Sequence, residues 1–202
     1  MRLIYVMDPM CGWCYGFQPE LEKFLTHYPS ANIEWVMGGL APDTTEPMDN
    51  TLKQTIASYW YQIEKRAQVK FNHDFWQLNT PYRSTYLACR AVISAEKLIE
   101  HGSHKMVKAI QSAYYLEAKN PSLEATLVDC ASSIGIDANQ FLAVLKSANT
   151  EQQFKQHLSL ARQLQVTGFP ALFFIDEANH AYPITLGFCS HEDLQQGLNQ
   201  LL

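Results

Sequence analysis

Residues 7–17 read Met-Asp-Pro-Met-Cys-Gly-Trp-Cys-Tyr-Gly-Phe, which places a Cys-x-x-Cys pair between an apolar run and an amphipathic one. The apolar run, residues 3–7, has the length and the β-branched and aromatic content of a buried strand that ends at Asp8-Pro9. After the pair, apolar residues recur at the offsets of one helix face: Phe17, Leu21, Phe24, Leu25 and Tyr28. We therefore predict that Cys11 and Cys14 lie on a strand-to-helix turn.

A helix N-terminus favours a thiolate, because the first backbone amides have no intrahelical partner and carry partial positive charge. Cys11, at or near the N-cap, is predicted to have the lower pKa and to attack disulfides. Cys14, one turn further on, is predicted to resolve the mixed disulfide. The active-site loop residues Gly12 and Trp13 add no charge or imidazole, so we expect a less extreme thiolate than a histidine-containing loop would give.

The Cys11–Cys14 pair could instead be half of a structural zinc site or two unrelated buried cysteines. A structural zinc site needs a second pair of ligands at similar spacing, but Cys89, Cys130 and Cys189 are isolated in the sequence, so we predict no metal. Cys89 and Cys130 lie in helical segments beside small apolar residues, which is typical of buried packing. Two unrelated buried cysteines at 11 and 14 are disfavoured by their position on the turn.

The remaining pattern predicts a second strand at 33–37, which completes a βαβ unit with a parallel strand pair. Residues 42–149 contain no plausible strand, and their predicted helices are 50–69, 85–100, 103–119, 122–134 and 137–146. A helix at 151–164, strands at 171–175 and 182–188 in a hairpin, and a helix opened by Ser190 follow. We predict an α/β fold (βαβ…ββα) in which residues 1–41 and 150–202 form one domain and 42–149 an inserted helical domain.

Composition narrows the classes of function. The 202 residues carry a net charge of −5, which gives no basic footprint for nucleic acid. No apolar run approaches the roughly 18 residues of a membrane span. Met1-Arg2 leads directly into the first strand, and five cysteines with one close pair do not read as a disulfide scaffold. We expect a cytoplasmic protein with neither nucleic-acid nor membrane partners.

The order of these motifs resembles the DsbA-type branch of the thioredoxin superfamily, and this resemblance implies a thioredoxin fold with a large all-helical insertion. The Cys-Gly-Trp-Cys pair after the first strand, the helical insertion and Gly168-Phe169-Pro170 before the hairpin carry the likeness. The segments 8–14, 37–40 and 88–92 resemble the FrnE-like subgroup. The resemblance implies that Cys11 attacks, that Cys14 resolves, that Pro170 follows a cis peptide bond, and that the Phe169 backbone pairs with extended substrate.

The function that this resemblance implies is thiol-disulfide oxidoreductase activity that reduces, oxidises or isomerises disulfides without a cofactor. Its partners would be disulfide-containing proteins or a small thiol such as glutathione. Asp8 is the nearest acidic candidate for a proton acceptor. Two alternatives stay open: a glutathione-dependent isomerase or transferase of the 2-hydroxychromene-2-carboxylate isomerase or kappa-class type, which carries serine in place of Cys11, and a non-catalytic peptide-binding module.

Overall fold

Four strands form one mixed sheet in the computed structural model, which describes residues 1–202. Their order across the sheet is β2 (Asn32–Met37), β1 (Arg2–Met7), β3 (Ala171–Ile175) and β4 (Ala181–Leu186). β1 and β2 are parallel, whereas β3 is antiparallel to both β1 and β4, so the predicted βαβ unit and hairpin are confirmed. β4 ends at Leu186, before the predicted Phe188, and its Pro183 lies on an edge strand beside an irregularity in the register.

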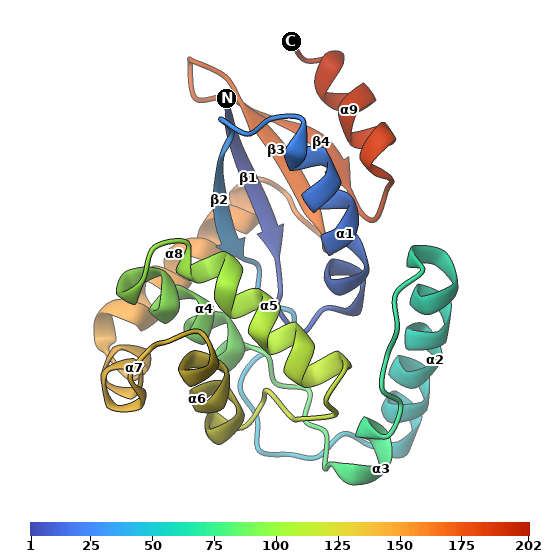
Figure 1. The fold of residues 1–202 in the computed structure, drawn as a ribbon, viewed down its shortest axis with the longest axis vertical. Coiled ribbons are helices and arrows are strands. Elements are labelled where there is room, and N and C mark those ends of the chain that lie inside the picture. The colour runs from blue at the N-terminus through green and yellow to red at the C-terminus, as the bar shows by residue number, and fades with distance from the viewer.

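Strand residues alternate between the two faces of the sheet, and different helices cover those faces (Figure 1). Leu3, Tyr5 and Met7 belong to the larger core cluster, together with apolar residues of α1 (Gly12–Thr26) and α9 (His191–Asn199). Ile4 and Val6 belong to a second cluster that includes Ala161 of α8 (Ala148–Gln163). This period of two buries β1 on both sides, so the chain leaves the sheet core directly into the Cys-x-x-Cys turn.

The segment between β2 and β3 is helical, as predicted, and it gathers beyond the ends of β1 and β2, with one helix alongside α1 (Figure 1). A short helix, α3, was not predicted, because its four residues are too few to show a helical period. The helices before α8 are α2 (Asn50–Ala67), α3 (Phe75–Leu78), α4 (Tyr86–Leu98), α5 (Gly102–Tyr115), α6 (Glu124–Ser133) and α7 (Ala138–Leu145).

One cluster of 37 buried residues runs from the sheet into these helices. No helix combines the length and apolar composition that a membrane span requires. The cluster joins Tyr5 and Phe17 to Trp60 of α2 and Tyr115 of α5. The division into residues 1–41 with 150–202 and residues 42–149 therefore describes parts that share a core, and its boundaries stay a prediction. The redox-type motif lies where the two parts meet.

Candidate active site

Cys11 is the N-cap residue of α1, and Cys14 lies in the first turn of that helix. Cys11 has extended backbone dihedrals, and its amide donates to the Asp8 carbonyl at 3.0 Å, which closes the turn between strand and helix. Cys11 is 7% exposed, whereas Cys14 is fully buried. A molecule approaching from solvent therefore reaches the sulfur of Cys11 before that of Cys14.

The two thiols of this pair have opposite acidities. A hydrogen bond from the Cys14 thiol and the amides of Cys14 and Trp13 lower the pKa of Cys11, against the opposing effect of burial. Burial raises the pKa of Cys14 well above the ordinary thiol value, and the hydrogen bond and charge of Cys11 raise it further. Of the two thiols, Cys11 is therefore the one that ionises first.

The remaining cysteines lack that activation. Burial raises the pKa of Cys130 to about 11, and it also raises the pKa of Cys189 and of Cys89. Cys130 is buried in the packing of α6, as expected. Cys89 is also buried, but its thiol donates to the Asp8 carboxylate at 3.4 Å, so it is more than apolar packing. Cys11 is the one cysteine of five whose pKa is lowered.

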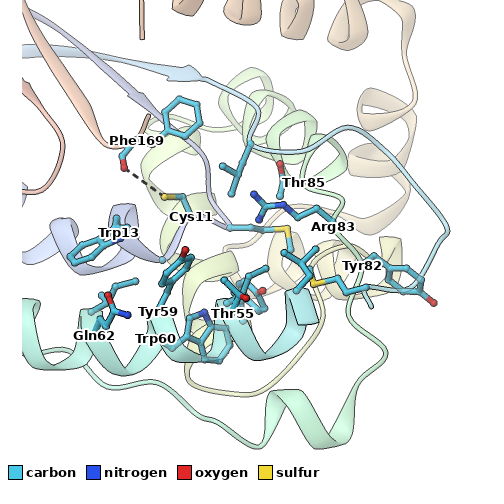
Figure 2. Close-up of a pocket in the computed structure, with 18 residues that line it drawn as sticks. Cys11, Trp13, Thr55, Tyr59, Trp60, Gln62, Tyr82, Arg83, Thr85 and Phe169 are labelled. Atoms are coloured by element: carbon cyan, nitrogen blue, oxygen red, sulfur yellow. Dashed lines mark hydrogen bonds between the residues drawn. The ribbon is translucent and has the colours of Figure 1, made fainter. Parts of the chain in front are cut away.

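The Phe169–Pro170 segment lies beside Cys11, and the peptide bond between these two residues is cis. The Cys11 thiol points at the Phe169 carbonyl oxygen, with 3.9 Å between Sγ and O (Figure 2). Gly38, at the end of β2, makes this approach possible, because a Cβ at that position would overlap the Phe169 ring. The sequence elements at 11, 38 and 169 therefore meet at one point.

A cavity of about 430 Å³ opens next to Cys11, and 13 of its 18 lining residues are hydrophobic (Figure 2). Of the six predicted site residues, Cys11, Gly12, Trp13 and Phe169 line it, whereas Cys14 and Pro170 lie buried outside the lining. Arg83 is the one charged lining residue. The others are Met10, Leu40, Met48, Leu52, Thr55, Ile56, Tyr59, Trp60, Gln62, Ile63, Tyr82, Thr85 and Tyr114.

Helix α2 forms one wall of this cavity, and two glycines of α1 allow it to lie close. A Cβ on Gly12 would lie 2.8 Å from the Ile63 side chain, and a Cβ on Gly16 would lie 2.9 Å from it. Contacts that short occur in essentially no real structure, so a neighbour must shift to admit a Cβ. At Gly12 that neighbour is the terminal Cδ1 of Ile63, which can turn aside. At Gly16 the Cβ of Ala67 also lies 3.0 Å away, so alanine at 16 would push α2 away from α1. Both glycines thus face α2, which the Cys-x-x-Cys spacing did not reveal, and Gly16 has the stricter packing role.

Asp8 anchors the turn from beneath, through contacts that sequence reasoning did not find. Its buried carboxylate accepts hydrogen bonds from the amides of Met10 (2.8 Å) and Leu40 (2.7 Å), from the Thr85 hydroxyl (2.6 Å) and from the Cys89 thiol. Burial raises the pKa of the carboxyl, and these four donors act in the opposite direction. Thr85 and Cys89 are 77 and 81 residues away in the sequence, and no local motif links them to Asp8.

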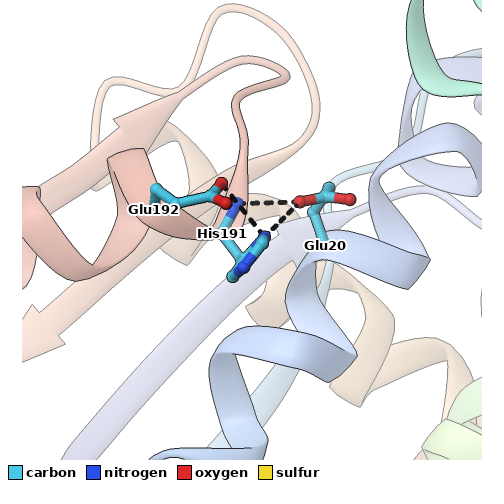
Figure 3. A group of neighbouring side chains, drawn as sticks. All are labelled: Glu20, His191 and Glu192. Atoms are coloured by element: carbon cyan, nitrogen blue, oxygen red, sulfur yellow. Dashed lines mark hydrogen bonds and ion pairs between the residues drawn. The ribbon is translucent and has the colours of Figure 1, made fainter.

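A separate polar cluster joins α1 to α9 away from the cavity (Figure 3). His191 Nδ1 lies 2.8 Å from Glu20 and 3.1 Å from Glu192, and the His191 amide donates to Glu20 at 2.9 Å. Glu20 also pairs with Lys23 at 2.8 Å. Glu20, His191 and Glu192 lie near enough together to hold a metal ion, but their ligand atoms already pair with one another and with Lys23. The cluster fastens α9 to α1.

Known proteins of similar sequence indicate the family of this chain. The sequence profile of the family described as Thioredoxin matches residues 4–195. The ClpXP adapter protein SpxH of Halalkalibacterium halodurans is 21% identical over 182 residues, which is 88% of this chain but 59% of that protein. The chain thus spans well under two thirds of the length of the curated relatives it matches.

Several solved structures have the same fold as this chain over nearly the whole length of both proteins. A candidate protein disulfide isomerase from Nitrosomonas europaea has a TM-score of 0.88 and 27% identity, and the match covers 98% of this chain and 96% of that one. The cytosolic disulfide reductase DsbM from Pseudomonas aeruginosa has a TM-score of 0.81 and 23% identity over 100% of this chain and 98% of its own. DsbM with GSH scores 0.79 at 23% identity, covering 100% of this chain and 98% of DsbM. With its matching profile, sheet order and helical segment, the chain belongs to the thioredoxin family and has the architecture of the DsbA-like oxidoreductases.

Proposed function

We propose that this protein is a thiol-disulfide oxidoreductase in which Cys11 is the attacking thiol and Cys14 the resolving one. The observation that carries the proposal is the acidity of Cys11, the one thiol of five with a lowered pKa, at the N-cap of α1 and at the wall of an apolar cavity. Reactive cysteines are those with lowered pKa values and access to a substrate. The serine of the alternative isomerase and transferase group could not perform this exchange.

In the reducing direction the Cys11 thiolate attacks one sulfur of a substrate disulfide, and the other substrate sulfur leaves as a thiol after taking up a proton. Cys14 then attacks Cys11, which releases the second substrate thiol and leaves an intramolecular disulfide. The Phe169 carbonyl lies beside Cys11 and accepts from no backbone amide, so an extended substrate segment can bind to it by strand addition. The reverse sequence of steps oxidises a dithiol.

The cavity indicates what kind of substrate fits. Apolar walls suit the hydrophobic residues that flank a cysteine in an unfolded or extended protein segment. Arg83, the one charged lining residue, suits a carboxylate. A protein segment and a carboxylate-bearing thiol such as glutathione both meet these requirements, and DsbM, a structural neighbour named as cytosolic, has been solved with GSH. We accordingly propose glutathione as a recycling thiol and the cytoplasm as the compartment.

The test is reduction of a disulfide-bonded model protein, insulin, with glutathione as the recycling thiol. The wild-type protein is expected to accelerate the reaction, and Cys11→Ser is expected to abolish it. Cys14→Ala should retain the first attack and accumulate a mixed disulfide on Cys11. Cys130→Ser, which changes a buried thiol of raised pKa, is the matched control and should behave as the wild type. Full activity in Cys11→Ser would overturn the proposal.

A second candidate, a non-catalytic peptide-binding module, is favoured by the adapter proteins among the relatives and by the apolar cavity. In that case peptide binding, measured by fluorescence anisotropy of a labelled unfolded peptide, would persist unchanged in the Cys11→Ser, Cys14→Ser double variant, and insulin reduction would be absent from the wild type. Exchange activity in the wild type that depends on Cys11 would contradict this candidate.

A further inference from the structure

The cavity beside Cys11 carries one unpaired positive charge. The side chain of Arg83 is exposed and forms neither an ion pair nor a hydrogen bond with another protein group, and no aspartate or glutamate lines the cavity with it. Arg90, by comparison, pairs with Asp43 and Glu151. Figure 2 shows the Arg83 side chain extending into the cavity. Its charge is therefore available to a negatively charged ligand.

The backbone that carries Arg83 is fixed beside the redox turn. Two residues further on, the Thr85 hydroxyl donates to the Asp8 carboxylate at 2.6 Å, and the Asp8 carbonyl accepts from the Cys11 amide at 3.0 Å. Ser84, between them, is held by hydrogen bonds through both its hydroxyl and its carbonyl. A charge on a backbone that is already ordered loses less freedom when a ligand binds.

Tyr114 adds a hydroxyl donor to the same cavity. Its side chain lines the cavity and is only 4% exposed. Its ring packs edge-on against Trp60 and Phe75, with centroid distances of 5.4 and 4.8 Å. The hydroxyl bonds to no protein group, and unlike the hydroxyls of Tyr5 and Tyr115 it is not sealed from solvent. Buried polar groups are nearly always paired, so this hydroxyl is free to pair with a ligand.

The chemistry of these two groups defines the ligand. Arg83 is the one charged lining residue, so it balances one negative charge, whereas a dianion would leave a charge unpaired among apolar walls. Burial raises the pKa of Tyr114 above the ordinary phenol value, and the charge of Arg83 acts in the opposite direction, so the phenol keeps its proton and donates. A carboxylate supplies one negative charge and two acceptor oxygens. The cavity volume of about 430 Å³ is that of a small-molecule site.

We infer that Arg83 and Tyr114 form a carboxylate subsite that selects a small thiol bearing a carboxylate, or its disulfide, as the substrate of Cys11. This inference rests on the proposed function and narrows it, because it ranks the small thiol above a protein segment. In the exchange the Cys11 thiolate forms a bond to one sulfur of the substrate disulfide. The bond between the two substrate sulfurs breaks, and the second sulfur leaves with the electron pair and takes a proton from water. Arg83 and Tyr114 keep their protons throughout.

The experiment compares a disulfide that carries carboxylates, glutathione disulfide, with one that carries none, bis(2-hydroxyethyl) disulfide. Each reduced protein, with Cys14→Ala to stop the reaction at the mixed disulfide, is mixed with one of them, quenched with acid and followed by intact mass. The measured quantity is the ratio of the two rate constants, which cancels any change in the acidity of Cys11. Arg83→Gln and Tyr114→Phe are each expected to lower this ratio about tenfold, the effect of one lost hydrogen bond to a charged group.

Two control variants change the same chemistry outside the cavity. Arg162→Gln removes an exposed arginine of α8, and Tyr115→Phe removes a hydroxyl that is unpaired but sealed from solvent. Both should keep the wild-type ratio. The urea unfolding midpoint of Tyr114→Phe should not fall, since the lost hydroxyl has no protein partner and the ring contacts remain.

A second measurement tests the subsite without the redox chemistry. The Kd of S-methylglutathione, which cannot exchange, should rise about tenfold in Arg83→Gln and in Tyr114→Phe when it is measured by calorimetry. An unchanged ratio and Kd in either variant, or an equal loss in the controls, would overturn the subsite. If Arg83→Gln slows insulin reduction as much as it slows the reaction with glutathione disulfide, the selected carboxylate belongs to a protein segment and the small-thiol assignment is wrong. A wild-type protein that forms no mixed disulfide with either compound would instead overturn the proposed function.

Discussion

Replacing Asp8 with alanine should destabilise the protein far more than the loss of a typical aspartate. The amides of Met10 and Leu40 donate to this carboxylate at 2.8 and 2.7 Å, and both would lose their acceptor, Met10 in the core and Leu40 at the partly buried wall of the cavity. Thr85 can turn to the Ala41 carbonyl, 3.3 Å from its hydroxyl, and Cys89 is a weak donor. One buried and one partly buried amide left unpaired, at about 1–3 kcal/mol each with the second at the lower end, give a loss of about 3 kcal/mol, a large share of the roughly 5–15 kcal/mol that holds a domain folded.

Urea unfolding at neutral pH measures this loss, with the slope of the transition as a check on two-state behaviour. Asp49→Ala is the matched control, since the Asp49 carboxylate also accepts from a backbone amide, that of Leu52, but as an exposed helix cap. Such a cap is worth about 1 kcal/mol. If Asp8→Ala costs no more than Asp49→Ala, the four-donor anchor is not what holds the redox turn, and the reasoning is refuted.

Three further predictions concern redox poise and pH. The reduction potential of the Cys11–Cys14 pair should lie well below about −120 mV, the value of strongly oxidising thiol-disulfide oxidoreductases, because the intervening Gly-Trp adds no cation. Redox equilibration with glutathione measures this potential, and a value of about −120 mV would contradict the prediction. Burial lowers the pKa of His157 to about 4, and its Nδ1 accepts from the Met37 amide. The unfolded chain therefore binds more protons than the folded protein below about pH 6.5, so stability should be full above that pH and fall towards pH 4. In thermal melts, His157→Gln should reduce this loss of stability. Burial acts to raise the pKa of Glu20, but hydrogen bonds from Lys23 and His191 outweigh it and lower the pKa to about 2. The ionised carboxylate therefore stabilises the fold above about pH 4.5, and this stabilisation is lost as the pH falls towards 2. Acid unfolding of Glu20→Gln should show a smaller change in stability in that window.

Much of the fold could be predicted from the sequence because its strands and long helices have clear periods. The run 3–7 and the offsets after Cys14 placed the pair on a strand-to-helix turn, and Cys11 is indeed the N-cap of α1. The capping box at Ser190 is also present. These are local signals, in which residues within one turn or one strand determine the structure.

The surroundings of the pair could not be predicted, because they depend on contacts between distant parts of the chain. Asp8 meets Thr85 and Cys89 only after the helical segment has folded back onto the sheet. The need for glycine at 16 and 38 arises from Ala67 and the Phe169 ring, which no spacing rule connects to them. Tyr114 read as an ordinary helix residue, since an unpaired hydroxyl in a cavity becomes visible only once every neighbour is placed.

The acidity of Cys11 is the most direct test of the account. Alkylation of the fully reduced protein with iodoacetamide over a range of pH, with each cysteine followed by peptide mass spectrometry, gives the pKa of every reactive thiol. We expect Cys11 to react first and to titrate below about 8.5, the free-thiol value, while Cys14 and the other three cysteines react only at higher pH. If Cys14 reacts before Cys11, or if Cys11 titrates at or above that value, Cys11 is not the attacking thiol.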